Sequence, residues 1–148
     1  MPVYCYSSAM ERLLSTYIFL IPVVVLVLTE FTKFFVHYLR AGNWEEKLFH
    51  PGGFPSSHSA FVTSLMLVVW KRQGIESTEF AIAFILACIV WYDAVAVRRQ
   101  LGQQAQILNR LQHWQHLKER LGHSFTEVLG GIAFGALVTF LGIIFINR

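Results

Sequence analysis

The chain has 148 residues, 55% of them hydrophobic and 14% charged, which favours a compact membrane protein of one domain, residues 1–148, over a soluble globular domain. Its net charge of +3 comes from basic residues scattered among apolar runs, a pattern that argues against nucleic acid and suits anionic headgroups or a phosphate. The two cysteines, Cys5 and Cys88, form no CxxC motif and indicate no disulfide framework.

Four hydrophobic segments approach the length of about 20 apolar residues that a helix needs to cross a bilayer core. The first covers about residues 13–39 and continues into charged residues without a small-residue cleavage site, which argues against a cleaved signal peptide. The second, residues 59–70, is short and spans only if its polar start lies in the membrane or its terminal cations snorkel. The third and fourth cover residues 80–97 and 125–146.

Apolar residues at a spacing of three to four recur through residues 101–122, between the third and fourth segments. This pattern predicts an amphipathic helix that lies at the membrane interface or packs on the bundle. The predicted fold is therefore an all-α integral membrane bundle with about four transmembrane helices plus one amphipathic helix. Such a multi-pass protein has both termini on one side, and the distribution of Lys and Arg leaves open which side is cytoplasmic.

Lys33, His37 and Arg40 are spaced so that they share one face of the first predicted helix. Charged side chains at membrane depth are costly and normally face a cavity or a partner. The alternative is that Lys33 pairs with Glu30 while Arg40 extends to the headgroups.

His123 and Glu127 are one helical turn apart at the start of the fourth segment, and Gly131 and Gly135 continue the same face. A carboxylate in that position accepts the imidazole N–H, which fixes the tautomer and leaves the other ring nitrogen free to attack or bind a substrate. The alternative is structural: Glu127 favours the helix N-terminus, and the two glycines form a packing face.

The sequence Pro55-Ser56-Ser57-His58 stands directly before the second apolar segment. Ser56 or Ser57 would cap this helix, and the N–H groups of its first turn would form an anion site into which His58 projects. A capping serine is common, and a lone histidine there indicates little. Together with the lysine, the arginines and the His123 pair, however, these residues indicate a phosphate-transfer pocket. No metal-ligand set and no cofactor are expected.

These residues resemble motifs of the type 2 phosphatidic acid phosphatase superfamily, which also includes bacterial acid phosphatases and vanadium haloperoxidases. The resemblance is strongest to its small divergent membrane branch. The first motif, a lysine and an arginine with six residues between them, reads Lys33-FFVHYL-Arg40 here, with Ala41 where a proline is expected. The second, Pro-Ser-Gly-His, reads Pro55-Ser56-Ser57-His58, with a serine in place of the glycine.

The third motif joins an arginine to a histidine and to a carboxylate one turn further on. Here the histidine and carboxylate read His123-SFT-Glu127, with glutamate in place of aspartate. The arginine is best matched by Arg98 or Arg99, on the far side of the 101–122 insert. The resemblance covers nearly all of the chain from about Lys33 onward.

The resemblance implies a membrane phosphatase that hydrolyses a lipid or isoprenoid phosphate monoester, or a diphosphate, through a phosphohistidine and without a metal. It makes His123 the nucleophile, Glu127 the residue that orients it and His58 the general acid. The implied phosphate-binding residues are Lys33, Arg40, Ser56, Ser57, Arg98 and Arg99. The implied partners are a lipid phosphate and the membrane, without nucleic acid, and self-association into a homo-oligomer stays open.

Asp93 lies outside the three motifs, near the end of the third segment. It would balance Arg98 or Arg99, or else place a catalytic water. His113 and His116 are three residues apart in the 101–122 stretch, but no further ligand stands at metal-binding spacing, which favours a solvated helix face.

Two other functions compete with the phosphatase. A non-catalytic membrane protein would keep the pocket to bind a phosphate headgroup or to scaffold a partner, and the changes at Ser57 and Glu127 favour it. A proton or ion carrier would use Glu30, Lys33, His37 and Asp93, but it would not need the PSSH and HxxxE sequences.

Overall fold

The structure is a computed structural model that describes residues 20–36, 38–39, 53–112, 116–119 and 121–146, and all regular elements among them are helices. An N-terminal helical segment (residues 20–36 and 38–39) precedes the other elements. These are α2 (Ser57–Gln73), α3 (Thr78–Tyr92), a π-helical turn η1 (Asp93–Val97), α4 (Arg98–Leu111) and α5 (Phe125–Ile146). The all-α prediction is confirmed, and α5 has the bounds expected for the fourth segment.

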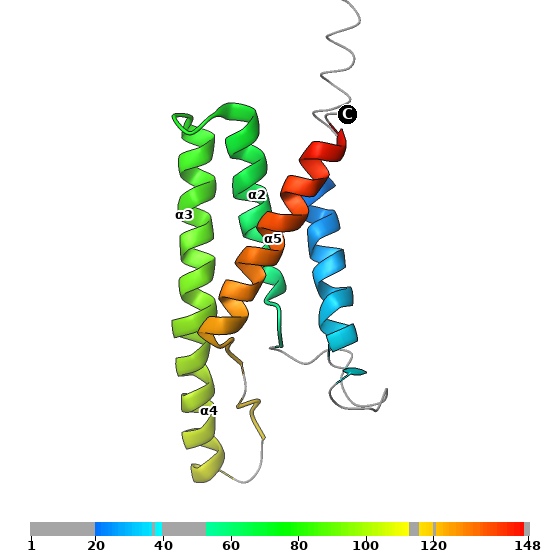
Figure 1. Cartoon of the computed structure of the whole chain (residues 1–148). Coiled ribbons are helices and arrows are strands. Elements are labelled where there is room, and N and C mark those ends of the chain that lie inside the picture. The colour runs from blue at the N-terminus through cyan, green and yellow to red at the C-terminus, as the bar shows by residue number, and fades with distance from the viewer. Residues whose placement is uncertain (1–19, 37, 40–52, 113–115, 120, 147–148) are drawn as a thin grey trace, which may run out of the picture.

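Helices α2 and α5 cross at close range because glycines of α5 face the backbone of α2 (Figure 1). A Cβ atom added at Gly131 would collide with the carbonyl oxygen of Ser56. One added at Gly135 would collide with the carbonyl oxygen of Ala60 and lie 2.8 Å from its Cα. The glycine packing face predicted from the sequence is therefore confirmed, and it carries α5 directly onto the first turns of α2.

In the part of the chain that the structure describes, an apolar core joins the N-terminal helical segment to α2 and α5. Its buried members there are Ile21, Val25, Ala60, Val68 and Ile143. Close to it, the Thr139 hydroxyl lies 2.7 Å from the Ser64 hydroxyl and 2.6 Å from the carbonyl oxygen of its own helix at Gly135. These fully buried hydroxyls satisfy each other across the α2–α5 contact.

Large apolar side chains cover the outer faces of the helices. On α3 alone, the exposed ones are Ile82, Phe84, Ile85, Leu86, Ile89 and Tyr92. A water-soluble protein rarely exposes apolar patches of this extent. Within the described residues, Thr78–Leu111 and Phe125–Phe145 are long and apolar enough to cross a membrane.

Helices α3 and α4 form one continuous rod, joined by η1 (Figure 1). The apolar third segment, expected over residues 80–97, ends where η1 ends, and the rod continues from there as α4 to Leu111. The amphipathic helix predicted over residues 101–122 is confirmed only in its first part, which belongs to α4. Residues 116–119 and 121–124 are not helical.

The residues after α4 return along its side, held there by one side chain. Asn109 Oδ1 accepts the N–H of Leu117 at 2.8 Å, and Asn109 Nδ2 donates to the Leu117 carbonyl at 2.9 Å. Gly102 has no Cβ, so the carbonyl of Glu119 can lie directly against it. The helical spacing of Leu117 and Leu121 was misleading because Asn109 replaces the hydrogen bonds that a further helical turn would make.

Candidate active site

Those predicted site residues that the structure describes gather at one end of the bundle. Here α2 and α5 both begin, the rod passes at η1, and the N-terminal helical segment ends (Figure 1). The junction is tied by the backbone, since the N–H of Ser56 donates to the carbonyl of Glu127 at 3.0 Å. The start of α2 is therefore fixed to the first turn of α5.

Ser56 is the N-cap of α2, which confirms the capping prediction. Its hydroxyl accepts the N–H of Ser59 at 3.4 Å and lies 3.0 Å from the Ser59 hydroxyl. Ser56 and Ser59 are fully buried, whereas His58 is exposed at the mouth of the turn. In the first turn, Ser56 therefore caps the helix, and His58 is exposed.

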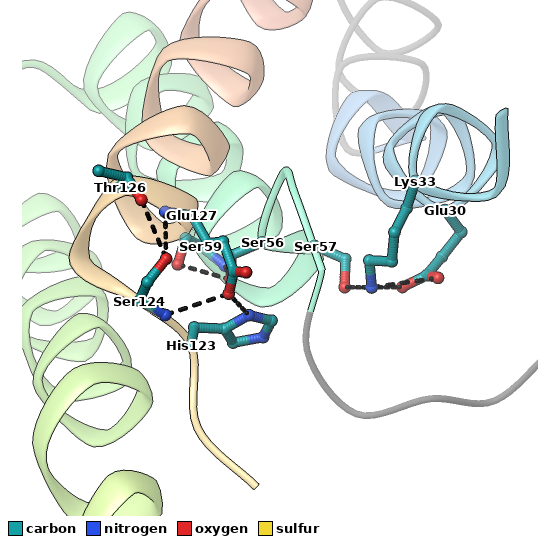
Figure 2. A network of polar contacts seen from close by, with 9 residues as sticks. All are labelled: Glu30, Lys33, Ser56, Ser57, Ser59, His123, Ser124, Thr126 and Glu127. Carbon is teal, nitrogen blue, oxygen red and sulfur yellow. Dashed lines mark hydrogen bonds and ion pairs between the residues drawn. The ribbon is translucent and has the colours of Figure 1, made fainter. Parts of the chain in front are cut away.

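Lys33 reaches from the N-terminal helical segment to α2. Its Nζ atom lies 3.1 Å from Glu30 Oε1 and donates to the Ser57 hydroxyl at 3.2 Å (Figure 2). The lysine therefore makes the local ion pair with Glu30 and also contacts the predicted phosphate site. Gly53, with a φ of 104°, allows the chain before α2 to pass close to the lysine stem, because a Cβ there would lie 3.3 Å from Lys33 Cγ.

His123 is held from two directions. Its Nδ1 atom lies 3.0 Å from Glu127 Oε2 (Figure 2). Its backbone N–H donates to the carbonyl of Ala94 in η1 at 3.1 Å. The residue is 7% exposed. With Nδ1 facing the carboxylate, Nε2 is the ring nitrogen left for a reacting group.

Ser124 completes this arrangement, although it was not among the predicted site residues. The N–H of Ser124 donates to Glu127 Oε2 at 3.1 Å, and the N–H of Glu127 donates to the Ser124 hydroxyl at 3.2 Å. This reciprocal pair is a capping box, and the spacing of Ser124 and Glu127 in the sequence could have predicted it. One carboxylate therefore both starts α5 and orients His123.

The π-helical turn brings Asp93 and Arg98 to the same face of the rod. Arg98 Nε lies 2.8 Å from Asp93 Oδ2, so Asp93 balances Arg98, one of its two predicted roles. The N–H of Arg98 bonds to the carbonyl of Asp93, whereas in an α-helix it would bond to that of Ala94. The carbonyl of Ala94 instead accepts the backbone N–H of His123.

His58 lies where the charged groups of these elements converge. It lies within electrostatic range of Arg98, His123, Lys33 and Glu30. The Arg99 side chain is exposed, and its backbone is packed against Gly122, where a Cβ would lie 2.9 Å from Arg99 N. Of the two arginines proposed for the third motif, Arg98 is the one that lies within electrostatic range of His58.

The comparisons with known proteins place the chain in a family. The model of the divergent PAP2 family matches residues 14–138, which include every predicted site residue. The chain belongs to the divergent PAP2 family. It is also 38% identical over 108 residues to the uncharacterized membrane protein YuiD of Bacillus subtilis (strain 168), a match that covers 60% of this chain and 68% of YuiD. No solved structure matches.

In this divergent PAP2 protein, two of the departures from the superfamily motifs have defined contacts. Ser57, in the glycine position, uses its hydroxyl to bind Lys33, and Glu127, in the aspartate position, reaches His123 without breaking the capping box. Among the described residues no group of three or more His, Cys, Asp or Glu could hold a metal ion. His37, Arg40 and His113 lie outside the described residues.

Proposed function

We propose that this protein is a multi-pass integral membrane phosphatase that hydrolyses a lipid or isoprenoid phosphate monoester, or a diphosphate, through a phosphohistidine on His123. The observation that carries the proposal is the 3.0 Å contact between His123 Nδ1 and Glu127. It orients a nucleophile in the neighbourhood of His58, which also lies within electrostatic range of Lys33 and Arg98 from two other elements. Membership of the divergent PAP2 family supports the same chemistry at a coarser level.

In the proposed first step, His123 Nε2 attacks the phosphorus and the bond from phosphorus to the leaving oxygen breaks. Glu127 stabilises the positive charge that develops on the imidazole. His58 donates its proton to the leaving alkoxide, which departs as an alcohol. In the second step a water attacks the phosphohistidine, His58 takes the proton of that water, and phosphate leaves with His123 restored.

The phosphoryl oxygens gain negative charge during both steps and need fixed cations and N–H groups around them. We assign this role to Lys33, Arg98 and the start of α2 with Ser57. Arg40 and Arg99 are further candidates by resemblance, and Ser56 would contribute through its position in the cap. Lys33 and Arg98 are each paired with a carboxylate, so an incoming phosphate would compete with Glu30 and Asp93 for them.

The direct test is phosphate release by the purified protein in detergent with a chelator present. We expect inorganic phosphate from phosphatidate or from an isoprenoid phosphate or diphosphate, with a rate that the chelator leaves unchanged. Release that stops with the chelator and returns with a divalent cation would contradict the metal-independent mechanism. Binding of these lipids without turnover would instead support a non-catalytic headgroup-binding protein.

Arg98→Ala is expected to lower kcat/KM about 10- to 100-fold, because a hydrogen bond to a charged group contributes about 1.5–3 kcal/mol. Arg99→Ala is the matched comparison, since it removes the same side chain one position further along the rod. Steady-state kinetics on the best substrate measures both. A larger loss from Arg99→Ala than from Arg98→Ala would show that Arg99, and not Arg98, binds the phosphoryl oxygens.

A further inference from the structure

Helix α4 extends beyond the end of the bundle at which α2 and α5 begin (Figure 1). Its 14 residues correspond to about 21 Å of helix. Its arginines and glutamines make α4 too polar for the hydrocarbon core. With α3 and η1 crossing the membrane as proposed, α4 stands outside the hydrocarbon on the side of the candidate site.

A stripe of side chains along this rod repeats with the spacing of a coiled coil. The spacings are four, three, four and three residues, and we call the stripe the α4 seam: Val97, Leu101, Gln104, Leu108 and Leu111. Its apolar members are 40%, 48%, 47% and 77% exposed. The return segment packs on a different side of α4, at Gly102 and Asn109, so within the described residues the seam faces outward.

We propose that the α4 seam pairs with the α4 seam of a second copy of this chain, as a short parallel two-stranded coiled coil. Two copies inserted in one membrane with one orientation present α4 in parallel and at equal depth. Their seams therefore meet in register about a two-fold axis along the membrane normal. Leucines at 101 and 108 would occupy one seam position of the heptad, and Val97, Gln104 and Leu111 the other.

The charge pattern favours a second copy over a different partner. Flanking seam positions carry the charges that select partners in coiled coils, and the exposed ones here hold Gln100 and Ile107, while Ala105 is already buried within this chain. Arg98, at the remaining flank of the first turn, is bound by Asp93. Two identical seams thus meet without repulsion. The amide of Gln104 can also donate to and accept from the same amide of the other copy.

Two heptads are short for a coiled coil in solution, where isolated helices of this length are marginal. Here α4 is already helical because it continues α3, so dimerisation does not have to include the unfavourable nucleation of a helix. Confinement in the membrane also raises the effective concentration of the partner seam. Gln104 lowers the stability of the pair but favours one register.

Disulfide crosslinking in lipid vesicles tests the pairing, in a background in which Cys5 and Cys88 are replaced by Ser. Single cysteines at the seam, Gln104→Cys and Leu108→Cys, are compared with Gln103→Cys and Gln106→Cys on other faces of α4. We expect a covalent dimer to form at least about tenfold faster from the two seam variants, because paired seam positions bring the sulfur atoms within bonding distance. Adding Leu101→Lys to Leu108→Cys should slow it again.

Equal rates at all four positions would mean random collision and would overturn the proposal. The absence of a dimer at every position would also overturn it. The α4 seam would then contact the membrane surface or another protein. The readout needs no substrate, so it depends on the proposed membrane placement and not on catalysis. An inactive protein that crosslinks at the seam would refute the phosphatase alone.

Discussion

His123→Asn should reduce phosphate release by about 10³-fold or more, because asparagine has no ring nitrogen to form the phosphoryl intermediate. Asparagine keeps a side-chain N–H that can still donate to Glu127, so the start of α5 should remain intact. Single-turnover assays with a ³²P-labelled substrate would measure the loss. They would also detect the acid-labile, base-stable phosphohistidine in the unchanged protein and its absence in the variant.

His116→Asn is the matched control, since His116 is exposed on the return segment, away from the contacts that hold His123. It should retain nearly full activity. If His123→Asn kept a tenth or more of the rate while the protein remained folded, His123 would not be the nucleophile. A labelled intermediate that persisted in His123→Asn would lead to the same conclusion.

Gly135→Ala should destabilise the protein by about 1–3 kcal/mol, a cost typical of forcing an extra methyl into a packed contact. The new methyl would collide with the backbone of Ala60, and backbone cannot rotate away as a side chain can. Because α2 starts only a few residues earlier, separation of the two helices would also displace the Ser56–Glu127 backbone contact. Thermal unfolding in detergent should show a midpoint lower by several degrees, with activity lost in parallel.

Gly142→Ala is the control on the same helix. There the added methyl would lie 3.5 Å from atoms of Ile21, an ordinary van der Waals contact. Its midpoint should stay close to that of the unchanged protein. Equal stability of the two variants would show that α2 and α5 do not cross as closely as the structure indicates.

The sequence was most informative where the determining interactions are local. The bounds of α5 follow from a long, mostly apolar run, and the His123–Glu127 contact follows from a spacing of one turn. The cap of α2 follows from the chemistry of Ser56. In each case the partners are within a few residues of each other, so a pattern in one short stretch is sufficient.

Other features depend on residues far apart or on backbone detail that composition does not carry. The π-helical turn leaves the apolar pattern of the rod almost unchanged, so nothing in the pattern distinguishes it from an α-helix. The return segment kept a helical spacing of leucines, although Asn109 holds it in a different conformation. The contact from Lys33 to Ser57 joins two helices, and only the fold decides which of the neighbouring polar groups the lysine meets.

The π-helical turn fixes how α4 is rotated about the rod axis relative to α3. Each residue of an α-helix advances the side chains by about 100°, so removing one residue from η1 would rotate the whole of α4 by roughly that angle relative to α3. Arg98 would then leave the candidate site, and the stripe of leucines beyond it would turn to a new direction. The number of residues in η1 therefore sets the orientation of everything that follows on the rod.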